Sequence, residues 1–139
     1  MIHERTIYIT DYDLYRLRLL LDASVRLEGR NTQHLRDLKD ELDRAQIIKS
    51  SQIPPNVITM NSRFLLRDLE TDQSGEYTLV FPGRANHSRG MISIVTPIGT
   101  ALLGRREFDR IEFDTPAGRK RFQILDLVYQ PEAAEQFHL

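Results

Sequence analysis

The sequence predicts an α+β fold, in which a short N-terminal helical hairpin precedes a mostly antiparallel sheet with one short helix. Up to about residue 45, leucines recur at three- and four-residue steps, which is typical of helices with one buried face. Pro54 and Pro55 interrupt that pattern, because proline lacks an amide hydrogen and restricts the residue before it. Beyond them, the apolar residues follow the period of strands. The expected organisation is a hairpin over 1–50, a linker over 51–56 and a second domain over 57–139.

The first expected helix follows an extended segment that ends at Thr10. Thr10 and Asp11 are suitable N-cap residues, and Asp13 adds negative charge to the first turn, where the helix dipole favours it. A single apolar stripe of about five turns follows, formed by Leu14, Leu17, Leu21 and Val25. Gly29 can adopt the left-handed conformation that ends a helix.

The second expected helix starts after Asn31 or Thr32, either of which can cap it. Its apolar residues repeat in heptad fashion, and they are Leu35, Leu38, Leu42 and Ala45. Two such stripes joined by a short polar link predict an antiparallel coiled-coil hairpin with arms about 25 Å long. The abrupt change at the prolines favours a projecting appendage, although helices that simply cover the core of a compact domain would show the same stripes.

The second domain is expected to form a sheet of five or six strands. Strand-like runs occupy residues 57–60, 63–69, 76–81, 91–95, 110–114 and 120–129. Turn sequences at 72–75 and 115–118 separate neighbouring runs. A short helix over residues 98–103 is expected before the last pair, because Pro97 suits a first helical position and Gly104 suits a helix end.

Composition predicts a cytoplasmic protein without a membrane span. The chain has no apolar run long enough to cross a bilayer, and its N-terminus lacks the apolar stretch of a signal peptide. Cysteine is absent, which removes disulfides and thiolate chemistry. The 19 basic and 20 acidic residues are balanced on both sides of Pro54. This balance disfavours direct nucleic-acid binding, since phosphate-binding surfaces carry a basic excess.

No arrangement of residues predicts catalysis, a metal site or a cofactor. The histidines lack the spacing of a ligand set; they are His3, His34, His87 and His138. Residues 99–106 have the glycine spacing of a phosphate loop, but arginines stand where its lysine and hydroxyl residue belong. Asp37 and Glu41 share a helix face, for which a solvated charged surface is a better interpretation than a catalytic dyad. We therefore expect a non-enzymatic protein.

Four blocks spread over nearly the whole chain carry a family resemblance. They are residues 41–46 (ELDRAQ), 57–63 (VITMNSR), 96–104 (TPIGTALLG) and 129–134 (YQPEAA). In this order and spacing they resemble the Rnk family, regulators of nucleoside diphosphate kinase and relatives of the Gre transcript-cleavage factors of bacterial RNA polymerase. The resemblance implies an FKBP-like, Gre-type C-terminal domain that docks at the rim of the polymerase secondary channel, with the coiled coil projecting into the channel.

The resemblance also implies where this chain contacts the polymerase. The S/T-P-I loop before the short helix looks like the docking contact of the Gre C-terminal domain. In this sequence that loop corresponds to Thr96, Pro97 and Ile98, with Ser93 just before it. In one departure from the Gre pattern, Phe108 stands where glycine usually precedes the aspartate, which we expect to alter a turn without changing the fold.

The hairpin tip differs from that of a cleavage factor. Gre cleavage factors present acidic residues at the end of a long coiled coil, where they help to hold a catalytic magnesium. Here the hairpin is shorter, and its tip has the single carboxylate of Glu28 between Arg26 and Arg30. Metal-assisted hydrolysis needs converging carboxylates without a neighbouring cation that competes for magnesium.

The resemblance and the tip together lead to one functional expectation. The protein is expected to be a non-enzymatic RNA polymerase-binding transcription regulator that competes with Gre-type factors and so affects nucleoside diphosphate kinase levels. The alternative is a Gre-like cleavage factor in which Glu28, with Asp37, acts on polymerase-bound magnesium. Two further alternatives are peptidyl-prolyl isomerase activity, for which the aromatic residues show no obvious clustering, and direct action on the kinase, for which no nucleotide site is apparent. The sequence leaves the oligomeric state open.

Overall fold

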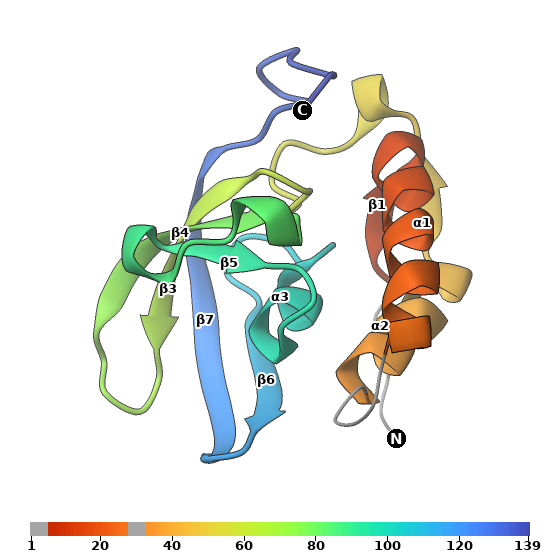
Figure 1. The fold of residues 1–139 in the computed structure, drawn as a ribbon. Coiled ribbons are helices and arrows are strands. Elements are labelled where there is room, and N and C mark those ends of the chain that lie inside the picture. The colour runs from red at the N-terminus through yellow and green to blue at the C-terminus, as the bar shows by residue number, and fades with distance from the viewer. Residues whose placement is uncertain (1–5, 28–32) are drawn as a thin grey trace.

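The fold has two parts, a helical hairpin and a five-stranded sheet against which a short helix packs (Figure 1). The computed structural model describes residues 6–27 and 33–139. The first part contains β1 (Tyr8–Thr10), α1 (Asp11–Leu27), α2 (Gln33–Arg44) and β2 (Gln46–Ile48). The second contains β3 (Arg63–Asp68), β4 (Ser74–Val80), β5 (Met91–Ser93), α3 (Pro97–Leu102), β6 (Arg110–Thr115) and β7 (Gly118–Tyr129). Short 3-10 turns are η1 (Ser50–Gln52), η2 (Pro82–Arg84) and η3 (His87–Arg89).

The segments that precede α1 and follow α2 lie side by side. In a small parallel sheet Tyr8 pairs with Gln46 and Thr10 pairs with Ile48, so the start of α1 lies beside the end of α2. This pairing was not predicted, because it joins two three-residue segments across the whole hairpin. The helix α2 ends at Arg44 and measures about 18 Å, which is shorter than the expected arm.

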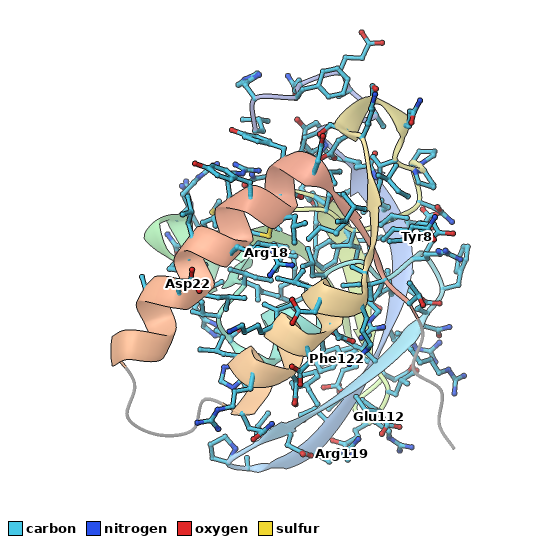
Figure 2. All side chains as sticks on the ribbon, turned by 90° about the vertical axis from the view of Figure 1, so that its right-hand side faces the viewer. Tyr8, Arg18, Asp22, Glu112, Arg119 and Phe122 are labelled. Atoms are coloured by element: carbon cyan, nitrogen blue, oxygen red, sulfur yellow. The ribbon has the colours of Figure 1, made fainter. Side chains whose placement is uncertain are left out.

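The hairpin packs into the same core as the second part instead of projecting from it as a free appendage. Its apolar stripes enter the same core cluster as the sheet residues, and the members from the first part are Ile7, Ile9, Leu17, Leu21, Leu35, Leu38 and Leu42. Figure 2 shows the hairpin in front of the sheet, with Glu112 and Arg119 below α2. The structure thus favours the alternative in which the helices close a shared core, while the domain boundaries at 50 and 57 stay a prediction.

The sheet is mixed, with the order β5-β4-β3-β7-β6. The pair β4–β5 is parallel and the other three pairs are antiparallel. The pairing of β3 with β7 shifts register on both sides of Phe64, whose side chain is fully buried. The expected α+β class, with five strands and one short helix in the second part, is confirmed.

The expected strand over residues 57–60 is wrong. Val57 makes only an isolated bridge to Arg106, and the chain turns at Asn61, where φ is +70°. Residues 57–60 are all buried, and the Ile58 amide and carbonyl form hydrogen bonds with the loop that follows α3. The apolar run therefore reflects burial in a core loop, which periodicity alone does not separate from a buried strand.

The first turn of α1 is fixed to the second part by Asp13. Thr10 caps the helix as predicted, since its Oγ1 accepts a hydrogen bond from the Asp13 amide at 3.0 Å. The Asp13 carboxylate, which is only 1% exposed, accepts hydrogen bonds from the Met60 amide at 3.0 Å and from Arg16 at 2.6 Å. A residue expected to complement the helix dipole thus also joins α1 to the loop before β3.

The burial of Asp13 makes the stability of the fold depend on pH. Burial raises the pKa of Asp13 above its usual 3.8, against hydrogen bonds from Met60 and Arg16 that oppose the shift. The pKa of Asp13 is higher in the folded than in the unfolded protein, so protonation of Asp13 stabilises the fold. This contribution to the free energy of unfolding is complete below the unfolded-state pKa and is lost as pH rises through the folded-state pKa. We expect the free energy of unfolding of the wild type, relative to Asp13→Asn, to increase as pH falls from 7 to 4 in urea titrations. A constant difference would contradict this prediction.

Candidate functional site

A tight turn over residues 93–98 joins β5 to α3 and brings the four predicted docking residues together. Thr96 is the N-cap of α3: its Oγ1 accepts from the Gly99 amide at 3.1 Å and donates to the Ser93 carbonyl at 2.7 Å. Ser93 Oγ accepts from the Val95 amide at 3.2 Å. Pro97 begins the helix, as predicted. The 93–98 turn is therefore held by hydrogen bonds of its own.

The 93–98 turn packs against the backbone of α3 at Gly99. A Cβ atom at this position would lie well inside van der Waals contact of the Ser93 carbonyl oxygen and 2.9 Å from the Ile94 Cα. Only glycine lets the two backbones approach so closely. The glycine that resembled part of a phosphate loop thus has a packing role, since residues 97–102 form a helix.

An apolar hollow of about 360 Å³ opens on one side of the turn. Ser93, Thr96 and Ile98 form part of its wall. The other lining residues are Tyr77, Ala85, His87, Gly90, Met91, Ile92 and Phe122. Sequence reasoning saw no aromatic clustering, and that was wrong: Tyr77 and Phe122 come from β4 and β7, which both flank β3, and Phe122 stacks on Phe113 with centroids 5.8 Å apart.

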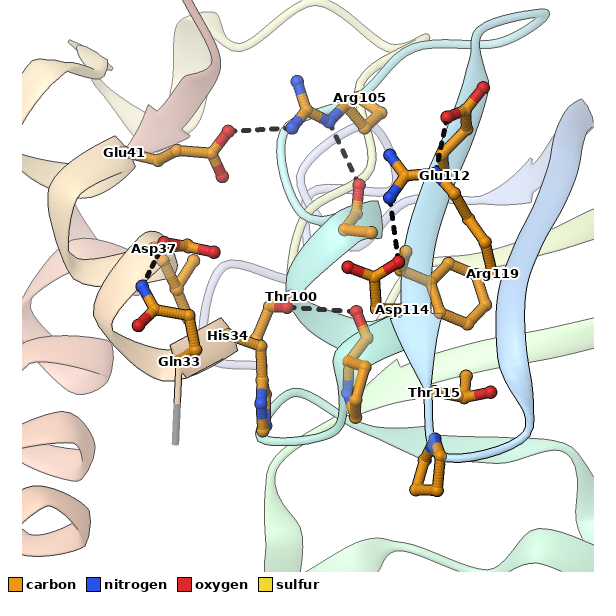
Figure 3. A pocket seen from close by; sticks show the side chains of 15 residues that line it. Gln33, His34, Asp37, Glu41, Thr100, Arg105, Glu112, Asp114, Thr115 and Arg119 are labelled. Carbon is orange, nitrogen blue, oxygen red and sulfur yellow. Dashed lines mark hydrogen bonds and ion pairs between the residues drawn. The ribbon is translucent and has the colours of Figure 1, made fainter. Parts of the chain in front are cut away.

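A polar cleft of about 530 Å³ lies on the other side of the turn, between α2, α3 and the β6–β7 hairpin (Figure 3). Both arginines that line it are paired with carboxylates. Arg105 contacts Glu41 at 2.8 Å, and Arg119 contacts Glu112 at 2.9 Å and Asp114 at 2.8 Å. Because carboxylates occupy both of these guanidinium groups, neither arginine is a free cation for a phosphate.

Two residues of α2 contact the second part in ways that the sequence analysis did not predict. The Nε2 of His34 lies 2.7 Å from the Val95 carbonyl oxygen, and Glu41 pairs with Arg105. Only Asp37 of the expected solvated face stays within α2, where Gln33 donates to it at 2.9 Å. The signal was available, because residues 34, 38 and 41 share one helix face and Leu38 belongs to the predicted apolar stripe.

The predicted tip residues fall at the end of α1 and beyond it. Arg26 belongs to α1, whereas Glu28 and Arg30 lie outside the described residues. Phe108, the departure from the Gre pattern, has φ of +73° and is 65% exposed. Its amide donates to the Ile124 carbonyl at 2.8 Å. This hydrogen bond helps to keep a phenylalanine in the left-handed backbone region, which glycine usually occupies.

Within residues 6–27 and 33–139, no group of three or more His, Cys, Asp or Glu side chains is arranged to hold a metal ion. In the same ranges no helix combines the length and the apolar character needed to cross a membrane.

Comparisons with known proteins agree with this architecture. Residues 53–129 match the family "Transcription elongation factor, GreA/GreB, C-term", and residues 5–48 match the family "Rnk N-terminus". The regulator of nucleoside diphosphate kinase from Escherichia coli K12 is 38% identical over 137 residues, which cover 96% of this chain and 97% of that protein. The transcription elongation factor GreA from Nitratiruptor is 35% identical over 102 residues, or 73% of this chain and 63% of that protein.

A solved structure extends the similarity to the fold. The GreA/GreB-type elongation factor from Nitrosomonas europaea superposes with a TM-score of 0.73 at 35% identity, covering 91% of this chain and all of that one. At this coverage the similarity includes both the hairpin and the sheet. The chain therefore belongs to the Rnk family, with a GreA/GreB-type C-terminal domain on residues 53–129.

Proposed function

We propose that this protein is a non-enzymatic transcription regulator that binds RNA polymerase at the rim of the secondary channel and competes with Gre-type factors. One observation carries the proposal: the 93–98 turn is pre-formed and stands at the edge of the apolar hollow. The family relationship to elongation factors supports polymerase as the partner. Such a regulator would act in the cytoplasm, where the polymerase is.

The geometry suits docking by a side chain of the partner. Interfaces commonly depend on a few apolar anchors that fill pockets, and the hollow has the volume of a small ligand pocket. Hydrogen bonds within the turn reduce the conformational entropy that binding would otherwise cost. Ile98 is half-buried at the wall of the hollow, so it can contact such an anchor without rearrangement of the turn.

An effect on nucleoside diphosphate kinase would follow from changed transcription. Direct binding of a nucleotide in the cleft is disfavoured, because Arg105 and Arg119 are both paired with carboxylates. Adding this protein to purified kinase should leave the kinase rate unchanged, and a changed rate would favour direct regulation.

Polymerase binding tests the proposed docking surface. We expect Ile98→Asp to weaken binding to core polymerase at least about tenfold, because a carboxylate at the wall of an apolar hollow must be desolvated on docking. Val128→Asp is the matched control, since Val128 is an exposed residue of β7 outside the hollow. Titration against a labelled Gre factor gives both affinities. Absence of wild-type binding at micromolar concentration, or equal losses in both variants, would contradict the proposal.

Two activity assays test the alternatives. If the protein stimulates RNA cleavage in stalled polymerase complexes, and if Glu28→Ala abolishes this, the cleavage-factor alternative is correct. The aromatic lining of the hollow warrants an assay of peptidyl-prolyl isomerisation on a proline-containing peptide. We expect no acceleration, because sharing a fold with an isomerase does not confer its activity.

A further inference from the structure

The helix α2 is tied to the second part by two polar contacts. At one end, His34 Nε2 lies 2.7 Å from the Val95 carbonyl oxygen; since a carbonyl only accepts, the imidazole donates. About two turns further on, Glu41 pairs with Arg105 at 2.8 Å. Both charged side chains are mostly buried, at 25% and 19% exposure. Arg105 is itself fixed, because its Nε donates to the Ala101 carbonyl at 3.0 Å.

The spacing of these contacts determines what they constrain. His34 and Glu41 are seven residues apart, or about 10 Å along the helix axis. Leu38, which is 1% exposed, lies between them on the same face. Leu35 and Leu42 are buried in the same core, but apolar packing is not directional and leaves the helix some freedom to tilt and rotate. The two directional contacts on either side of Leu38 restrict both the tilt and the rotation of α2, in addition to the contact of Asp13 in α1 with the Met60 amide.

The acceptor of the His34 hydrogen bond lies inside the 93–98 turn. The Val95 carbonyl accepts from His34, while the Val95 amide donates to Ser93 Oγ. His34 of the hairpin is therefore bonded to a residue that is itself held within the turn. Figure 3 shows His34 and Glu41 on α2 facing α3, and a dashed line marks the ion pair with Arg105.

We infer that His34 and the Glu41–Arg105 ion pair are positioning residues that set the orientation of the hairpin relative to the 93–98 turn. The importance of that orientation rests on the proposed function, because a polymerase that binds the turn then meets a hairpin that is already aligned. Alignment before binding avoids the entropy cost of ordering the hairpin in the complex. The shared core keeps the hairpin folded with or without these contacts. Loss of the contacts therefore changes the orientation of the hairpin but does not unfold it.

Distance measurements between spin labels test this inference on the free protein. The chain has no cysteine, so Lys39→Cys on α2 and Asp126→Cys on β7, both at exposed positions, give a clean labelled pair. We expect one narrow distance distribution in this background. Adding His34→Phe together with Glu41→Gln should broaden or shift it.

Two further variants separate positioning from general destabilisation. With Glu41 intact, His34→Gln should keep the narrow distribution, because the glutamine amide also donates a hydrogen bond, whereas His34→Phe should broaden it. Asp72→Asn removes an exposed ion pair with Arg67 away from the hairpin and should leave the distribution unchanged. A broad distribution in the labelled parent, or an unchanged one in the double variant, would overturn the inference.

The polymerase assay then gives the functional consequence. We expect the double variant to compete with a Gre factor about three- to tenfold less well, although the 93–98 turn keeps its sequence. If the wild type does not bind polymerase at all, the proposed function fails. The distance distributions of the free protein still decide the inference in that case.

Discussion

Replacing Leu38 by alanine should lower the free energy of unfolding by about 2–5 kcal/mol, the range for a large-to-alanine change in a packed core. Leu38 is 1% exposed and belongs to the cluster that includes Phe64 and Ile124 of the sheet. For a chain of this size, a loss of about 3 kcal/mol corresponds to a fall in Tm of roughly 10 °C.

The shape of the transition matters as much as its midpoint. Because the core is shared, far-UV and near-UV circular dichroism should shift together in one cooperative transition. A free hairpin would instead unfold separately and leave the tyrosine signal of the sheet unchanged. Leu19→Ala is the matched control, since Leu19 is 57% exposed on α1, and we expect its effect to stay within about 0.5 kcal/mol.

Gly99→Ala is the second substitution for which we expect a large effect. Alanine is favoured over glycine in a helix by about 1 kcal/mol, so propensity alone predicts stabilisation. The new methyl group would instead meet the Ser93 carbonyl oxygen and the Ile94 Cα, which are backbone atoms that cannot rotate away. We expect a net loss of about 2–3 kcal/mol, because the 93–98 turn must move away from α3.

Urea denaturation measures this loss, with Gly83→Ala as the control. A Cβ at Gly83 would have no atom within 4 Å, and its φ is not in the left-handed region. The control should therefore be neutral or slightly stabilising. Polymerase binding by Gly99→Ala should also weaken, because the displaced turn includes Ile98. Equal stability of the two variants would show that the approach of the two backbones is not a constraint.

The sequence predicted what depends on local periodicity. The stripes through Leu17 and Leu38 located both helices, and Pro97 with Gly104 bounded the short one, because each signal lies within a few residues. The strand at 57–60 failed since burial and strand pairing give the same apolar run. The pairing of β1 with β2 was missed because nothing near Gln46 indicates a partner at Tyr8.

For the candidate site, too, the sequence indicated features that are local in the chain and missed those that join distant residues. The 93–98 turn was predicted as a docking contact through the family resemblance, and its residues are neighbours in sequence. Arg105 and Glu41 are 64 positions apart, so their ion pair could not be read from spacing. The aromatic wall of the hollow was missed for the same reason, because only the order of strands in the sheet brings Tyr77 and Phe122 to one hollow.

The two outer strands of the sheet limit the ways in which another protein can attach. Unpaired strand edges invite a further strand, and charge or short length discourages it. In β6 the residues Arg110, Glu112 and Asp114 are exposed, and β5 is a strand of three residues of which Met91 is already bridged by Asn86. A partner therefore gains little by extending the sheet, which leaves recognition to side chains and guards the isolated protein against edge-to-edge aggregation.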